Sequence, residues 1–150
     1  MRWPLPLLLA LLLAGLVFPA LAADGNKIGY VSFREVSLSL QDRNARVDID
    51  YTLDPGMDLV VIIFGAGDLE KKLERSLNFP MLRIEDVGLT HAVFTADDVA
   101  LDYGGGAYWF PAHSFGVTFP LVEVRAPGCD LTFTDSRTIP QEFGYFGDKP

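Results

Sequence analysis

The sequence predicts an all-β protein, mainly antiparallel and folded as a β-sandwich, with one short lateral helix. From Ala45 to Leu53 every odd-numbered residue is apolar and every even-numbered residue is polar, which is the period of a strand with one buried face. Roughly eight short runs with strand character follow one another, and turn signals separate them. Only residues 68–78 show a helical period, so the regular strand–helix alternation of a parallel fold is missing.

Residues 27–53 predict an antiparallel hairpin. In its first strand the apolar residues change from odd positions at Phe33 to even positions from Val36 onward. Such a change turns the other face of the strand toward the core, which predicts a bulge or bend near residues 32–35. The polar residues 41–44 are expected to form the turn to the second strand.

Two elements of different type are predicted between residues 54 and 80. Residues 59–64 follow a turn signal and are apolar on both faces and mostly β-branched, which predicts a central strand covered on both sides. The predicted helix over 68–78 has Asp68 as its N-cap and ends at Pro80. One side of this helix carries the apolar stripe that is expected to pack on the sheets, namely Leu69, Leu73 and Leu77.

The remainder of the chain is rich in short strand-like runs. At Pro120 the apolar residues change from odd to even positions, and because proline costs a ladder hydrogen bond it marks an edge or a bulge. The number and spacing of the runs predict immunoglobulin-like proportions. The expected strands and the aromatic tail are 81–87, 89–94, 99–103, 108–110, 117–124, 129–134 and 139–146.

The N-terminus has the three parts of a secretory signal peptide. A single basic residue, Arg2, precedes the apolar run Leu5–Val17, and small residues then provide a cleavage site after Ala22. We therefore expect a secreted, extracellular or cell-surface protein with a single domain over 23–150. The alternative is an uncleaved signal anchor over residues 5–22, which would leave a single-pass membrane protein.

The chain is acidic, with 20 Asp and Glu against 12 Lys and Arg and a formal net charge of −8. A negative surface repels nucleic acid, which excludes that class of partner, and it repels anionic lipid head groups as well. Membrane contact is therefore expected only through the N-terminal segment, if that segment stays uncleaved. Cys129 is the single cysteine, so no internal disulfide is expected and packing must supply the stability.

The stretch 103–116 has the strongest features of a binding site. Three glycines precede the aromatic strand Tyr108, Trp109 and Phe110, and His113 follows it. Because a strand follows the glycines, we expect them to form a hairpin tip and not a phosphate loop. Tyr108 and Phe110 share one face of the strand and Trp109 takes the other, so if one set is buried the other is free to stack on a sugar or dock a protein. The alternative is that both faces are covered.

Four aspartates surround the turn near residue 54, namely Asp48, Asp50, Asp54 and Asp58. Calcium prefers oxygen ligands, and these carboxylates predict a calcium site at one end of the sandwich. The opposing interpretation is solvated charge, because Asp48 and Asp50 fall on the polar face of a strand and the spacing of an EF-hand is missing. No other metal motif and no GxSxG nucleophile motif occurs in the sequence. No cofactor is expected, and calcium is the one candidate.

These features favour a non-enzymatic binding or structural module at or outside the cell surface, with a protein or carbohydrate partner. The first alternative is an extracytoplasmic hydrolase that uses the clustered carboxylates, assisted by calcium. The second is an accessory domain that an uncleaved N-terminal segment holds at the membrane.

Overall fold

The computed structural model describes residues 25–147, and the predicted signal peptide over 1–22 lies outside them. Of the described residues, 59% lie in strands and 15% in helices. The strand pairs are mainly antiparallel, and two sheets contribute to one hydrophobic core. The predicted all-β, sandwich-like class is therefore confirmed.

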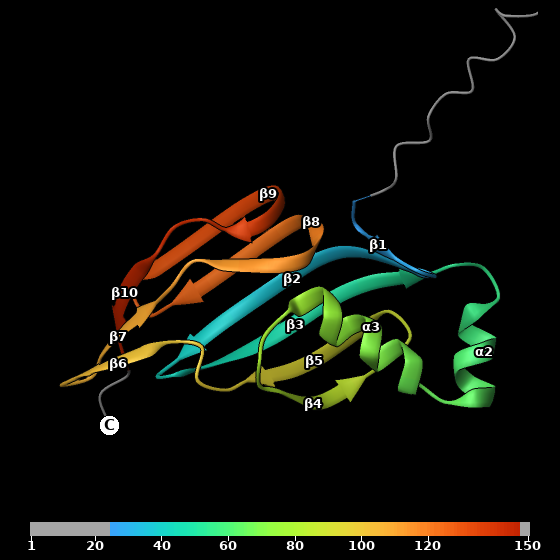
Figure 1. Ribbon diagram of the computed structural model, residues 1–150, viewed down its shortest axis with the longest axis horizontal. Helices are drawn as coiled ribbons and strands as arrows, with labels where there is room; N and C mark the ends of the chain where they lie inside the picture. The colour runs from blue at the N-terminus through green and yellow to red at the C-terminus, as the bar shows by residue number, and fades with distance from the viewer. Residues whose placement is uncertain (1–24, 148–150) are drawn as a thin grey trace, which may run out of the picture.

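A seven-stranded sheet forms the larger layer of the molecule (Figure 1). Its strands are β1 (Lys27–Ile28), β2 (Val31–Gln41), β3 (Asn44–Leu53), β4 (Leu82–Val87), β5 (His91–Ala96), β8 (His113–Ala126) and β9 (Cys129–Ile139). The order across the sheet is β4-β5-β3-β2-β8-β9, with β1 paired to β2 beside this path. β2 and β8 run parallel, and the other paired strands of this sheet are antiparallel.

A smaller antiparallel sheet closes one end of the molecule. It contains β6 (Leu101–Gly104), β7 (Ala107–Phe110) and β10 (Phe143–Phe146), in the order β10-β7-β6. The Tyr145 hydroxyl donates a hydrogen bond to the Asp42 carbonyl in the turn between β2 and β3. This bond and the buried rings of Phe110 and Phe143 fix the small sheet against the large one.

β2 and β3 form the predicted hairpin. Leu40 pairs with Ala45 beside the turn. The register shifts between Phe33 and Glu35, and the buried positions of β2 change there from odd to even. The bulge that the sequence predicts at residues 32–35 is therefore confirmed.

One face of the large sheet is buried and the opposite face is polar. The buried side chains alternate with partly exposed polar ones along β2, β3 and the second half of β8. Helix α3 (Gly67–Leu77) and the small sheet both contribute side chains to the core on the buried face (Figure 1). The polar face displays Ser37, Ser39, Asp48, Asp50 and Glu123.

Helix α3 confirms the predicted packing helix but has different ends. Its N-cap is Ala66, and the Asp68 carboxylate instead accepts a hydrogen bond from the Tyr30 hydroxyl at 2.9 Å. Asn78, in the left-handed conformation, ends the helix two residues before Pro80. The apolar stripe is fully buried as expected, at Leu69, Leu73 and Leu77.

The predicted central strand over 59–64 is wrong, and so is the expectation of a single helix, because these residues belong to α2 (Met57–Phe64). A short run without polar positions has no visible period, so its pattern does not separate helix from strand. Gly56 and Gly65, with φ of 85° and 90°, bracket the helix. Neither α2 nor any other helix within residues 25–147 has the length and apolar character needed to cross a membrane.

Candidate functional site

The central strand of the small sheet, β7, carries the aromatic residues that the sequence singles out. Trp109 pairs with Leu101 on one side and with Gly144 on the other. Side chains alternate along a strand, so Tyr108 and Phe110 lie on the side opposite Trp109. The Phe110 side chain is 1% exposed, whereas Trp109 is 37% exposed. The inner side of the sheet is therefore core, and the outer side reaches solvent.

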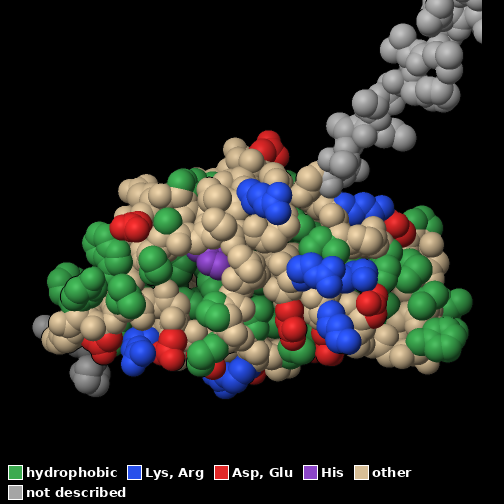
Figure 2. Space-filling model, viewed as in Figure 1, with side chains coloured by type: hydrophobic (Ala, Val, Ile, Leu, Met, Phe, Trp, Pro, Cys, Tyr) green, Lys and Arg blue, Asp and Glu red, His purple; other side chains and the backbone are tan. Residues whose placement is uncertain are grey.

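The outer side of the small sheet forms an exposed apolar surface, which we call the aromatic face. Its four large side chains are Leu101, Tyr103, Trp109 and Phe146, with exposed fractions of 56%, 71%, 37% and 71%. Phe146 pairs with Ala107, two residues from Trp109, and therefore lies on the same side of the sheet. Hydrophobic side chains gather at this end of the molecule, over β6, β7 and β10 (Figure 2).

Gly144 provides the space in which the indole of Trp109 lies. A Cβ atom added to Gly144 would stand 3.3 Å from Cε3 and 3.6 Å from Cζ3 of the indole. The ring therefore covers the backbone of β10. On the inner side, the Tyr108 ring stacks on Tyr145 with 5.7 Å between centroids, so the sheet is packed behind the exposed rings.

The other two predicted binding residues, Phe110 and His113, have packing roles in the structure. Phe110 lies in the core with its ring 5.5 Å from that of Phe143. His113 donates a hydrogen bond from Nε2 to the Leu77 carbonyl at 2.8 Å and stacks on Phe79 with 3.9 Å between centroids. Burial lowers the pKa of His113 below its ordinary value of 6.5. The structure therefore places neither side chain on the aromatic face.

Sequence reasoning missed three members of the aromatic face. The alternation of Leu101 and Tyr103 with Asp102 predicts a buried apolar side, and the tail aromatics are expected to close the core. The structure buries Phe143 and Tyr145 but leaves Phe146 exposed. Alternation separates the two sides of a strand without saying which side another layer covers, so no signal in the sequence marks these residues as exposed.

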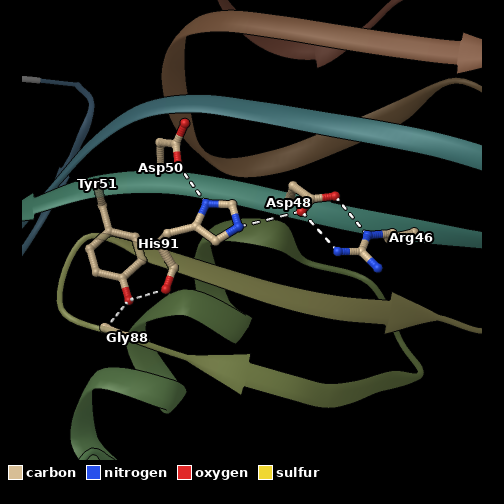
Figure 3. A network of polar contacts seen from close by, with 6 residues as sticks. All are labelled: Arg46, Asp48, Asp50, Tyr51, Gly88 and His91. Atoms are coloured by element: carbon tan, nitrogen blue, oxygen red, sulfur yellow. Dashed lines mark hydrogen bonds and ion pairs between the residues drawn. The ribbon is translucent and has the colours of Figure 1, made fainter.

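The predicted calcium ligands Asp48 and Asp50 meet a histidine on the polar face of the large sheet (Figure 3). His91 Nδ1 donates a hydrogen bond to Asp50 Oδ1 at 2.6 Å, and its Nε2 lies 3.4 Å from Asp48 Oδ1. Asp48 also pairs with Arg46, with 3.1 Å between Nε and Oδ2. The two carboxylates are therefore engaged by cationic or hydrogen-bonding side chains.

Asp54 and Asp58 do not join this network. Asp54 pairs with Lys27, with 2.9 Å between Nζ and Oδ1, and Asp58 lies in the first turn of α2. Within residues 25–147 no three His, Cys, Asp or Glu side chains are grouped as a metal ion would require. The predicted calcium site thus has no cluster of ligands in the described part of the chain.

An open hollow of about 670 Å³ lies at the bulge of β2, and Glu35 and Asp50 both line it. Burial raises the pKa of Glu35, and the neighbouring carboxylates Glu123 and Asp50 raise it further. A hydrolase of this kind needs two carboxylates that face one cleft, and Glu35 and Asp50 line the same hollow. Asp50 also accepts a hydrogen bond from His91. The hydrolase hypothesis stays a prediction.

Comparisons with models of known protein families, with curated proteins and with solved structures found no match. The site is therefore chosen on geometry alone. The aromatic face has exposed rings with a packed layer behind them. On the polar face, by contrast, Asp48 pairs with Arg46 and Asp50 pairs with His91. The aromatic face is the stronger candidate.

Proposed function

We propose that this protein is an exported, non-enzymatic binding module that docks a partner protein through its aromatic face. The observation that carries the proposal is the exposure of Leu101, Tyr103, Trp109 and Phe146 on one side of the small sheet. Together they expose on the order of 500 Å², which is as large as the largest apolar patch of a typical monomeric protein. The largest apolar patch of a monomeric protein is often its functional surface.

The composition of the aromatic face favours a protein partner over a carbohydrate. Tryptophan and tyrosine are the residues enriched at the energetic centre of protein interfaces. A sugar site needs several polar groups around the stacking ring, but the four side chains offer only the Tyr103 hydroxyl and the Trp109 indole N–H. The nearby Asp102 carboxylate already accepts a hydrogen bond from the Gly104 amide at 2.8 Å.

The sheet that carries the aromatic face is packed from behind, which also favours docking. β7 is paired on both sides, and the rings behind it are packed at 5.5 Å (Phe110 with Phe143) and 5.7 Å (Tyr108 with Tyr145). A preformed surface loses little conformational entropy when a partner binds. Less of the favourable contact energy is therefore offset by the entropic cost of ordering the surface.

The export part of the proposal is supported by the sequence of residues 1–22. Arg2, the apolar run Leu5–Val17 and the small residues up to Ala22 have the order of a signal peptide. An exported protein would meet its partner at or outside the cell surface. Recovery of the protein only from the cytoplasm would contradict this part.

The docking part is tested by finding the partner and measuring its affinity. Benzoylphenylalanine in place of Tyr103 would cross-link the partner in the producing cells, and the same residue in place of Ser37 on the polar face is the control. The identified partner, purified, should bind Trp109→Ala at least about 30-fold more weakly than wild type, or about 2 kcal/mol. Gly144→Val should also weaken binding, because its side chain displaces the indole.

A matched control comes from β4, where Ile84 is 41% exposed and lies outside the aromatic face. Ile84→Ala should leave the affinity for the partner unchanged. Equal affinities for wild type and Trp109→Ala would refute docking through this face. Cross-links formed only to a second copy of the chain would show that the aromatic face mediates self-association and does not bind a different protein.

A further inference from the structure

The large sheet ends in two edge strands, β4 and β9, because its order is β4-β5-β3-β2-β8-β9. A strand at the edge of a sheet has a row of backbone amides and carbonyls that point outward and can pair with another strand. Natural proteins protect such edges with charged side chains, bulges or short strands. The two edges of this sheet differ in that protection.

β4 is protected in all three ways. It is six residues long, and its register with β5 shifts between Ile84 and Asp86. Three of its six residues are charged, namely Arg83, Glu85 and Asp86. A further strand alongside β4 would meet both the bulge and these charges, so this edge is closed to pairing.

The first half of β9, residues 129–134, lacks this protection, and we call it the β9 edge. Its ladder with β8 is continuous, and Asp130 is its one charged residue. Positions 132–134 hold threonine and phenylalanine, which favour strands. Within residues 25–147, β9 pairs with β8 alone and lies along the rim of the large sheet (Figure 1). The outward backbone groups of the β9 edge therefore have no strand partner in the described chain.

The second half of β9 is closed by its own side chains. Asp135 has a left-handed φ of 47°, which interrupts the regular strand. The Ser136 hydroxyl donates a hydrogen bond to the Thr138 carbonyl at 2.7 Å and accepts one from the Thr138 amide at 3.2 Å. The length open to pairing is therefore residues 129–134.

We infer that the β9 edge pairs antiparallel with the β9 edge of a second copy of the chain and joins two large sheets into one. With Thr132 on the two-fold axis, Leu131 lies opposite Phe133 of the second copy, and Asp130 lies opposite Thr134. Each of these contacts occurs twice, as two-fold symmetry requires, and no two charges face each other. A shift by one pair toward the C-terminus would set Leu131 against Asp135.

The side chains of the β9 edge complement their own copies, which favours a second copy over an unrelated segment. Leu131 and Phe133 lie beside Val124 and Val122 of β8 and pack against the core, yet both remain partly exposed. In the dimer each would cover the other across the new strand pair. On the polar side Thr132 would meet its own copy, and threonine pairs stabilise antiparallel strands.

The dimer interface is small, so the dimer should be weak. Two paired strands of six residues bury less than the roughly 1,600 Å² of a standard protein interface, and we expect a dissociation constant of about 10 μM. The aromatic face belongs to the small sheet and has no residue in the β9 edge. The inference therefore does not depend on the proposed partner docking, and the two have separate tests.

Sedimentation velocity tests the association, with the chain from Ala23, which contains the whole described core. Wild type should change from monomer to dimer between about 1 and 200 μM. Thr132→Lys places two like charges at the axis and should weaken dimerisation by about tenfold or more. Thr52→Lys, at an exposed threonine of β3, adds the same charge elsewhere and should leave dimerisation unchanged.

Disulfide cross-linking tests the register. Opposed Cα atoms in an antiparallel pair lie about 4.5 to 5.5 Å apart, which is within the range of a disulfide. In a Cys129→Ser background, Thr132→Cys should therefore form an interchain disulfide on mild oxidation. Asp130→Cys in the same background should not, because its two copies would be separated along the strands by about 13 Å.

The inference is overturned if wild type stays monomeric at about 200 μM, or if Thr132→Lys dimerises as well as wild type. Equal cross-linking at positions 130 and 132 would also overturn it, because the register would then be wrong. A dimer that is lost in Trp109→Ala and kept in Thr132→Lys would place the contact on the aromatic face instead. Side chain 132 is exposed, so circular dichroism should show the same fold for Thr132→Lys as for wild type.

Discussion

His113 joins the end of α3 to the large sheet. Its Nε2 donates to the Leu77 carbonyl at 2.8 Å, its ring stacks on Phe79 at 3.9 Å, and it meets the edge of Phe115 at 4.9 Å. The ring is thus held neutral between aromatic neighbours, and burial lowers its pKa below 6.5. A residue that the sequence places in a candidate binding site is a packing residue in the fold.

The lowered pKa of His113 makes stability depend on pH. The unfolded chain takes up the proton at a higher pH than the folded chain, so the contribution of the neutral ring is complete above pH 6.5 and is lost as pH falls below that value. His113→Gln keeps a hydrogen-bond donor but does not titrate. Urea unfolding at about pH 7.5 and about pH 5 should show a smaller loss of stability in His113→Gln than in wild type. Equal losses would contradict the assignment, since His91 is present in both proteins.

Helix α3 approaches the large sheet closely enough that the contact requires a glycine. A Cβ atom added to Gly116 of β8 would stand 2.2 Å from the carbonyl oxygen of Arg75 in α3. The leucine stripe of α3 reaches the core because this approach is possible. The sequence shows the stripe but not the position on the strand against which it packs.

Gly116→Ala should therefore lower the free energy of unfolding by about 2 to 3 kcal/mol, because either the helix or the strand must move. Gly67→Ala in the first turn of α3 is the matched control, since its Cβ would have no neighbour within 4 Å and its backbone is unstrained. Thermal or urea unfolding followed by circular dichroism measures both variants. A Gly116→Ala protein as stable as wild type would show that the contact is looser than described.

At the scale of the whole molecule, the two sheets behave as parts of one core. The Tyr145 hydroxyl donates to the Asp42 carbonyl, and burial raises the pKa of Tyr145 to about 12. The Gly147 amide donates to the Gly106 carbonyl at 2.8 Å, which ties the end of β10 to the hairpin of β6 and β7. The aromatic face therefore depends on the large sheet for its support.

Tyr145→Phe should lower the free energy of unfolding by about 1 kcal/mol, because the Asp42 carbonyl loses its hydrogen bond. Unfolding should remain a single transition. Fluorescence of Trp109 reports on the small sheet, and far-ultraviolet circular dichroism reports mainly on the large one. Coincident transitions are expected in both proteins, and an earlier change of the Trp109 signal would show that the small sheet unfolds independently.

Much of the large sheet could be predicted from its pattern. The alternation from Ala45 to Leu53 identifies β3, and the change of phase after Phe33 identifies the bulge of β2, because both reflect which side of a strand is buried. Residues 59–64 could not be assigned in the same way, since an all-apolar run has no period. The sequence identifies Trp109 as the aromatic residue opposite Phe110. It does not show that Leu101 and Tyr103 from the preceding strand, and Phe146 from the tail, stay exposed on the same face.

The sequence by itself determined the all-β class, the hairpin of β2 and β3, the buried leucine stripe of α3 and the net negative charge. Only the tertiary structure decided which apolar side chains stay exposed, at α2 and on the aromatic face, and which aspartates share His91. The physical reason is that periodicity records the local contrast between the two sides of an element. Exposure and pairing depend on which other elements pack against each side, and that is a property of the whole fold.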